Sequence, residues 1–152
     1  MTLPGNALFH RLLLLCSTFV LVWTAPLSAA DKDWNVTQEV LANGLTILML
    51  EDHRAPVVSV QVWYKVGSRN ERPGITGVSH LLEHLMFRGT PKYGKGEFSR
   101  LVQEKGGSHN AFTSDDQTVY FENTASAHLD LLLELEADRM ANLTLDDKSN
   151  AK

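Results

Sequence analysis

Cysteine is almost absent from this sequence, and basic charge and long apolar runs are scarce as well. Cys16 is the single cysteine among 152 residues, so a disulfide framework within the chain is excluded. The 14 lysines and arginines are outnumbered by 18 aspartates and glutamates, and the formal net charge of −4 argues against nucleic acid as a partner. Internal repeats and low-complexity segments are also lacking. The composition is that of an ordinary globular domain.

The N-terminus carries one mainly apolar run, and it is short. Arg11 is followed by Leu12–Trp23, a run of 12 residues, whereas a helix that crosses a bilayer needs about 20. Small residues then lead to Ala30, directly before the charged Asp31. This pattern predicts a signal peptide over residues 1–30, an exported protein in the periplasm or secreted, and no stable membrane span after cleavage. An uncleaved anchor is the alternative.

The most informative segment is His-Leu-Leu-Glu-His at residues 80–84. At about 100° per residue on a helix, His80, Glu83 and His84 share one side. The opposite side is apolar and comprises Val78, Leu81, Leu82, Leu85 and Met86. The sequence therefore predicts an amphipathic helix over about residues 77–88, with Gly89 as its stop signal. We expect the leucine side to pack into a core and the polar side to face a cleft.

The residue types of this segment suit a zinc site. Neutral imidazole nitrogens bind zinc at about 2.0–2.1 Å, and a catalytic zinc usually has three protein ligands and one water. A nearby carboxylate such as Glu83 could take a proton from that water during attack on a carbonyl and return it to the leaving amine. Two histidines and a glutamate at this spacing also occur by chance in ordinary amphipathic helices. The five residues alone leave both interpretations open.

The surrounding sequence resembles a known family. The stretch GSRNERPGITGVSHLLEHLMFRGT, from Gly67 to Thr90, resembles the pitrilysin/insulinase family of zinc metallopeptidases, whose inverzincin signature is H-x-x-E-H. GGSHNAFTSDDQTVYF, from Gly106 to Phe121, is similar to the second block of that family, and ADRM, from Ala137 to Met140, is similar to a third. The resemblance covers nearly everything from Asn35 to Asp147.

The resemblance implies roles for individual residues. His80 and His84 would bind Zn²⁺ and Glu83 would be the general base, as in a zinc metalloendopeptidase that hydrolyses extended peptides or small proteins. Asn110 and Ala111 would lie in an edge strand beside the metal, onto which an extended substrate peptide adds through main-chain hydrogen bonds. From the residues alone, an ordinary edge strand after a Gly-Gly turn remains the alternative.

The resemblance also places the third zinc ligand, a glutamate, roughly seventy-five residues beyond His84 and therefore beyond Lys152. We expect residues 31–152 to be the N-terminal part of a catalytic lobe that is inactive by itself, with a C-terminal lobe or a partner subunit supplying the rest. The competing hypothesis is an exported, non-catalytic module for binding or assembly. Nothing in their spacing singles out these residues as substitute ligands: Glu97, Glu104, Glu134, Glu136, His109 and Asp115-Asp116.

Local patterns along the chain predict the architecture. Asn43-Gly44 is the strongest short hairpin signal, and apolar alternation marks further strands. The predicted strands are 36–41, 45–51, 57–66, 108–113 and 117–123, and the predicted helices are 77–88, 94–105 and 126–142. Strands followed by alternating helices and strands indicate an α+β fold, with a mixed, mainly antiparallel sheet and helices packed on one face.

Overall fold

The computed structural model of the protein describes residues 34–145, which divide into two units after Glu51. The predicted signal peptide over residues 1–30 lies outside these described residues. Between residues 34 and 145, no helix combines the length and the apolar character needed to cross a bilayer. All strand pairs in the described part of the chain are antiparallel.

The first unit contains a β-hairpin. Strand β1 (Val36–Val40) pairs with β2 (Thr46–Leu50) in a register that places Val40 opposite Thr46. The N–H of Gly44 donates to the carbonyl of Leu41 over 2.9 Å, and Gly44 has φ +86°. A turn with one left-handed residue at its end is the three-residue type of hairpin loop. The hairpin predicted at Asn43-Gly44 is therefore confirmed.

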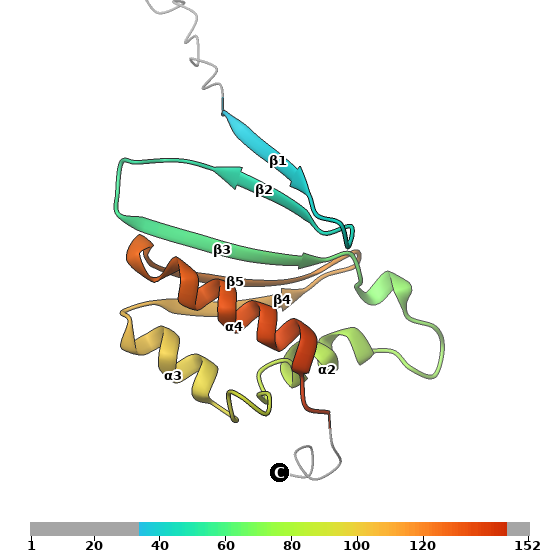
Figure 1. Ribbon diagram of the computed structural model, residues 1–152. Coiled ribbons are helices and arrows are strands. Elements are labelled where there is room, and N and C mark those ends of the chain that lie inside the picture. Colours follow the sequence, from blue (N-terminus) through green and yellow to red (C-terminus); the bar gives the residue numbers. More distant parts are fainter. Residues whose placement is uncertain (1–33, 146–152) are drawn as a thin grey trace, which may run out of the picture. The chain divides into compact units, whose positions relative to one another are not determined.

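The second unit is built on a three-stranded sheet (Figure 1). Its strands are β3 (Val57–Tyr64), β4 (Ser108–Thr113) and β5 (Thr118–Ala125), in the order β3-β5-β4. In the central strand, β5, five of the eight residues are buried. Since β4 pairs on one side only, it forms one edge of this sheet as described.

Helices α2 (Val78–Leu85), α3 (Glu97–Glu104) and α4 (Leu129–Asn142) accompany the sheet, together with short 3-10 helices at Ser68–Asn70 and Ser126–His128. All three α-helices contact the same sheet face. The core comprises Phe98 and Val102 of α3 and Leu132 and Leu135 of α4, with Val58 and Val60 of β3 packed against them. The predicted α+β fold, with its helices on one face, is confirmed.

Two glycines bring α3 close to the sheet. Gly106 has φ +68°, a left-handed conformation that suits a helix end. A side chain at Gly107 would meet both neighbouring elements, because its Cβ would lie 2.8 Å from the carbonyl oxygen of Asn123 and 3.0 Å from Val102. The Gly-Gly pair therefore lets the chain leave α3 and enter β4 directly beside β5.

A buried charged cluster joins α4 to β5. The side chain of Arg139 pairs with Glu136 and, at 3.4 Å, with Glu122, and all three residues are at most 4% exposed. The guanidinium carbon also lies 4.4 Å from the ring centre of Tyr120 and 4.5 Å from that of Phe98. Burial, followed by the proximity of Glu136, raises the pKa of Glu122 to about 9. Glu122 therefore keeps its proton to a higher pH than an exposed glutamate does.

Candidate metal centre

Helix α2 carries the His-Leu-Leu-Glu-His segment, and a carboxylate from the preceding loop holds its first turn. Glu71 accepts hydrogen bonds from the backbone N–H groups of Gly77, at 2.7 Å, and Ser79, at 2.9 Å. The hydroxyl of Ser79 donates to the carbonyl of Gly67 over 3.2 Å. A carboxylate suits a helix N-terminus because it satisfies free N–H groups and complements the helix dipole. Accordingly, the Ser79 and Gly77 N–H groups lower the pKa of Glu71.

Replacing Glu71 by glutamine is expected to lower the melting temperature at neutral pH. A carboxyl group with a lowered folded-state pKa stabilises the fold above its unfolded pKa of about 4.3, and this stabilisation is lost as the pH falls through the folded-state value. The difference between wild type and variant should therefore shrink on acidification. Thermal unfolding from about pH 7 to about pH 3 measures it. Glu39→Gln, on the exposed hairpin, is the control, and a pH-independent difference for Glu71→Gln would contradict this role.

The two histidines lie one turn apart on α2, and both are exposed. Their Nε2 atoms are 3.1 Å apart, and the ring centres are 4.7 Å apart. Two nitrogens bound to one tetrahedral zinc, each at about 2.0–2.1 Å, would be separated by roughly 3.3 Å. The Nε2 atoms of His80 and His84 therefore converge as two ligands of one ion would.

Glu83 has different surroundings from its two histidine neighbours. Glu83 is only 8% exposed, and its side chain faces strand β4. Its Oε2 atom accepts a hydrogen bond from the Thr113 hydroxyl at 2.5 Å. Thr113 is the last residue of β4 and was not predicted as a site residue. Thr113 lies 30 residues from Glu83 in the sequence, so no helix or strand period relates the two residues. The one sequence signal for Thr113 is its position two residues after Ala111, on the same face of the strand.

One prediction about α2 is wrong for the described residues. Leu81 is 55% exposed and Leu82 is 43% exposed, whereas Ser79, Glu83 and Met86 are buried. The helix therefore meets the sheet through the stripe that contains Glu83, and most of its leucine side points away. The helix itself also ends at Leu85, a few residues before Gly89. Periodicity separates two faces of a helix, but which face meets the sheet depends on the partner strands.

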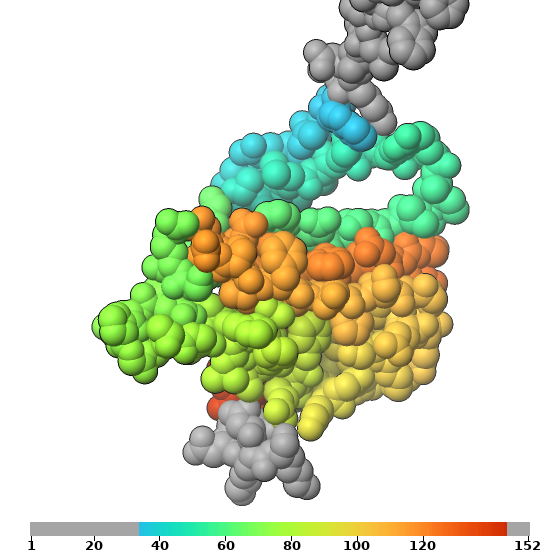
Figure 2. Space-filling model, turned by 180° about the vertical axis from the view of Figure 1, so that it is seen from behind, coloured from blue at the N-terminus to red at the C-terminus, as the bar shows by residue number. Residues whose placement is uncertain are grey.

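Asn110 and Ala111 lie in the middle of β4, opposite Phe121 and Tyr120 of β5. Asn110 is exposed and Ala111 is partly buried. The Oδ1 atom of Asn110 accepts a hydrogen bond from the N–H of Ala111 at 2.9 Å. In Figure 2 the orange segment that includes β4 lies beside the green segment that includes α2, on one face. The structure thus brings Asn110 and Ala111 into a sheet edge that packs against the histidine helix.

A third metal ligand does not join the two histidines among residues 34–145. His109 instead contacts the ring of Phe87 at a tilt of 32° and meets the ring of Phe98 edge-on, at 83°. The acidic residues considered as substitutes have other partners: Glu97 and Glu104 pair with Arg100, Glu134 with Lys92, Glu136 with Arg139, Asp115 with Ser68, and Asp116 with Arg69. The described residues therefore provide two convergent histidine nitrogens and a buried carboxylate.

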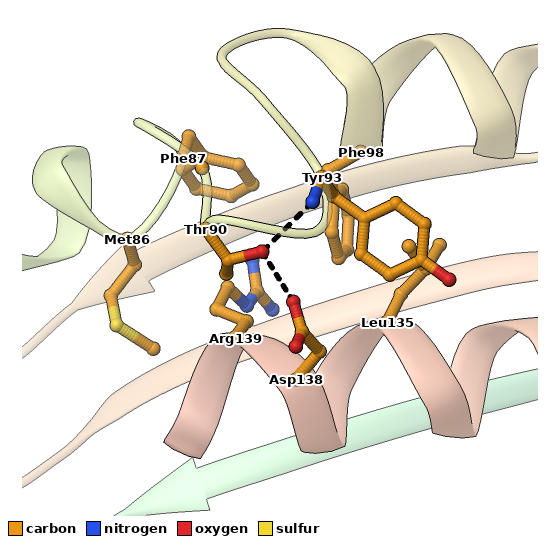
Figure 3. Close-up of a pocket in the computed structure, with 9 residues that line it drawn as sticks. Met86, Phe87, Thr90, Tyr93, Phe98, Leu135, Asp138 and Arg139 are labelled. Carbon is orange, nitrogen blue, oxygen red and sulfur yellow. Dashed lines mark hydrogen bonds between the residues drawn. The ribbon is translucent and has the colours of Figure 1, made fainter. Parts of the chain in front are cut away.

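A small pocket behind α2 is separate from this site. Figure 3 shows that the hydroxyl of Thr90 connects the loop after α2 to Asp138 of α4 and accepts a hydrogen bond from the N–H of Tyr93, at 2.9 Å. The pocket is lined by Met86, Phe87, Gly89, Thr90, Tyr93, Phe98, Leu135, Asp138 and Arg139. It contains none of the predicted site residues, and its contacts anchor the end of α2 to α4.

A histidine pair on a helix, with a buried glutamate between them and a sheet edge alongside, fits a metallopeptidase. Residues 46–152 match the family described as insulinase, peptidase family M16. The chain belongs to this family.

Relatives extend the comparison. The chain is 41% identical over 138 residues to the zinc protease PqqE of Helicobacter pylori, which covers 90% of this chain and 31% of the relative. It is 39% identical over 106 residues to human insulin-degrading enzyme, covering 69% of this chain and 10% of that enzyme. The crystal structure of a protease from Helicobacter pylori matches with a TM-score of 0.74 and 42% identity, over 76% of this chain and 28% of that chain. The chain thus spans a third or less of the length of these relatives.

Proposed function

We propose that the gene product containing this chain is a zinc endopeptidase in which His80 and His84 are two zinc ligands and Glu83 is the general base. The 3.1 Å separation of the two Nε2 atoms carries the proposal, because it places both nitrogens where one ion could bind them. Membership of the insulinase family and relatives named as zinc proteases support the same metal and reaction. The third ligand is expected from outside residues 34–145.

When bound, zinc would supply a Lewis acid that polarises the scissile carbonyl and makes water more acidic. The protein's own contribution is proton transfer. The Glu83 carboxylate takes a proton from the attacking water and gives it to the nitrogen of the leaving amine. Its burial between α2 and β4 suits this task, since a fixed carboxylate loses little entropy when the reacting atoms align.

The substrate that suits this site is an extended peptide. Strand β4 is an edge of the described sheet and packs against the helix that bears the histidines. A peptide that adds to this edge at Asn110 and Ala111 would be held through its main chain, which favours shape over a particular side chain. Such a peptide would have to replace the hydrogen bond between Asn110 Oδ1 and the N–H of Ala111.

Export and a further partner are part of the same proposal. The sequence of residues 1–30 supports secretion or a periplasmic location, because its pattern is typical of a signal peptide. Because the described residues bring together only two candidate ligands, a C-terminal lobe or a partner subunit would have to supply the third. The same observation favours the second candidate function, an exported and non-catalytic binding module.

The test compares the complete gene product with residues 31–152 alone. We expect the complete product to cleave extended peptides in a chelator-sensitive way, and His80→Ala with His84→Ala to abolish both zinc binding and cleavage. Residues 31–152 should bind zinc weakly and show little or no proteolysis, since two histidines form an incomplete site. Zinc titration by calorimetry and a peptide cleavage assay measure these results. Undiminished activity after loss of both histidines would refute the proposal.

A further inference from the structure

The hydroxyl of Thr113 makes a direct contact with the carboxylate of the proposed general base. Its Oγ1 atom lies 2.5 Å from Oε2 of Glu83; Glu83 is 8% exposed and Thr113 is partly buried. An ionised carboxylate can only accept hydrogen bonds, so Thr113 must be the donor. We propose that Thr113 is a positioning residue, which holds Glu83 in its reactive orientation through this bond.

Two oxygens lie within reach of the Thr113 proton, and the Glu83 carboxylate is the nearer one. Thr113 lies opposite Thr118 of β5, and their Oγ1 atoms are 3.4 Å apart. Thr118 has one hydroxyl proton, which it donates to the carbonyl of Val66 over 2.9 Å. Thr118 can therefore only accept from Thr113, and its oxygen is farther away, at 3.4 Å against 2.5 Å for the carboxylate oxygen, so the Thr113 proton is directed to Glu83. A β-branched side chain in a strand is also stiff about χ1, so the donor itself is held in place.

The bond fixes one carboxylate oxygen and leaves the other for chemistry. Thr113 contacts Oε2, so the lone pairs of Oε1 stay available for the proton that Glu83 is proposed to transfer. At the other end of the contact, the first turn of α2 is held through Ser79, whose N–H donates to Glu71 and whose hydroxyl donates to the carbonyl of Gly67. Glu83 is thus positioned by its own helix, α2, and by β4, the strand that forms the proposed substrate edge. Small errors in the placement of a reacting group can lower a rate strongly.

This inference rests on the proposed function of Glu83 and is tested by kinetics in the complete gene product. Thr113→Val keeps the shape of the side chain and removes the donor. We expect kcat to fall by about 10–100-fold, as is common for partners that orient groups of a metal site. KM and the zinc affinity should not change, because the Thr113 side chain contacts Glu83 and Thr118 rather than the histidines, and the main chain at Asn110 and Ala111 is left as it is. Thr113→Ser restores the hydroxyl and should recover most of the activity.

A matched control separates positioning from general destabilisation. Thr124 of β5 is 6% exposed, and its hydroxyl donates to the carbonyl of Lys105 over 3.1 Å. Thr124→Val therefore also removes a buried threonine donor. We expect Thr124→Val to shift the melting temperature about as much as Thr113→Val while leaving kcat unchanged. In a Glu83→Gln background, Thr113→Val should reduce the residual rate no further, because the two residues act as one unit.

The outcomes distinguish this inference from the function on which it rests. An unchanged kcat for Thr113→Val, an equal loss for Thr124→Val, or an additive loss on top of Glu83→Gln would overturn the role of Thr113 alone. Wild-type protein that holds zinc but cleaves no peptide, or full activity in Glu83→Gln, would overturn the proposed function and this inference with it.

Discussion

Replacing Glu83 by glutamine is expected to lower kcat of the complete gene product by about 10²–10⁴-fold, the usual contribution of a positioned general base. Glutamine keeps the size of the side chain, and its carbonyl oxygen can still accept the bond from Thr113. It cannot take up the proton of the attacking water. The rate of the proton transfer should therefore fall while the fold and the substrate edge remain intact.

Zinc binding provides the internal control for this variant. Glu83 accepts its bond from Thr113, whereas the two converging nitrogens belong to His80 and His84. The zinc affinity of Glu83→Gln should therefore equal that of wild type, and KM should change little. Glu104→Gln, an exposed replacement of the same type on α3, should leave kcat unchanged. Loss of zinc in Glu83→Gln would make Glu83 a ligand and exclude its role as a base.

Removing the guanidinium of Arg139 is expected to give the largest loss of stability. Arg139→Ala would leave Glu136 charged and buried without its counter-ion, and such a loss typically costs about 3–5 kcal/mol of unfolding free energy. The variant would also lose the stacking of the guanidinium on Tyr120 and Phe98. Denaturant unfolding, followed by circular dichroism, measures the change.

Two controls show whether the buried charge is the cause. Glu122→Gln imitates a protonated acid, so its stability relative to wild type should rise as the pH rises from about 4.5, the ordinary glutamate value, towards about 9. The sign follows from the raised pKa of Glu122, because a folded state that keeps a proton loses stability as the pH rises above the unfolded value. Arg100→Ala removes an exposed arginine with two glutamate partners and should change stability little. Equal losses in Arg139→Ala and Arg100→Ala would contradict the argument.

The histidine helix illustrates how far the sequence alone could lead. The spacing of His80 and His84 predicts a shared face, and the structure places their Nε2 atoms 3.1 Å apart. Both properties are local, since they depend only on the 3.6-residue period of one helix. The hairpin at Asn43-Gly44 was predicted for the same reason, because a turn is determined by a few adjacent residues.

Contacts between segments that are far apart in the sequence could not be predicted from local periodicity. The pairing of Thr113 with Glu83, and of Arg139 with Glu122, joins residues on separate elements, and no local period relates them. The buried stripe of α2 is neither of the two predicted faces, because it combines Glu83 of the polar side with Met86 of the apolar side, while both histidines are exposed. The leucine side has the greater hydrophobicity, yet the stripe containing Ser79, Glu83 and Met86 is the buried one.

The sequence by itself determined the family, the α+β class, the positions of the main helices and strands, and the candidate zinc-binding pair. Only the tertiary structure decided that Glu83 is buried against β4, that Thr113 is its hydrogen-bond donor, and that Glu122 shares a buried cluster with Arg139. The physical reason is that helix and strand periods set which residues share a face. The partner of each face depends on packing across the whole chain.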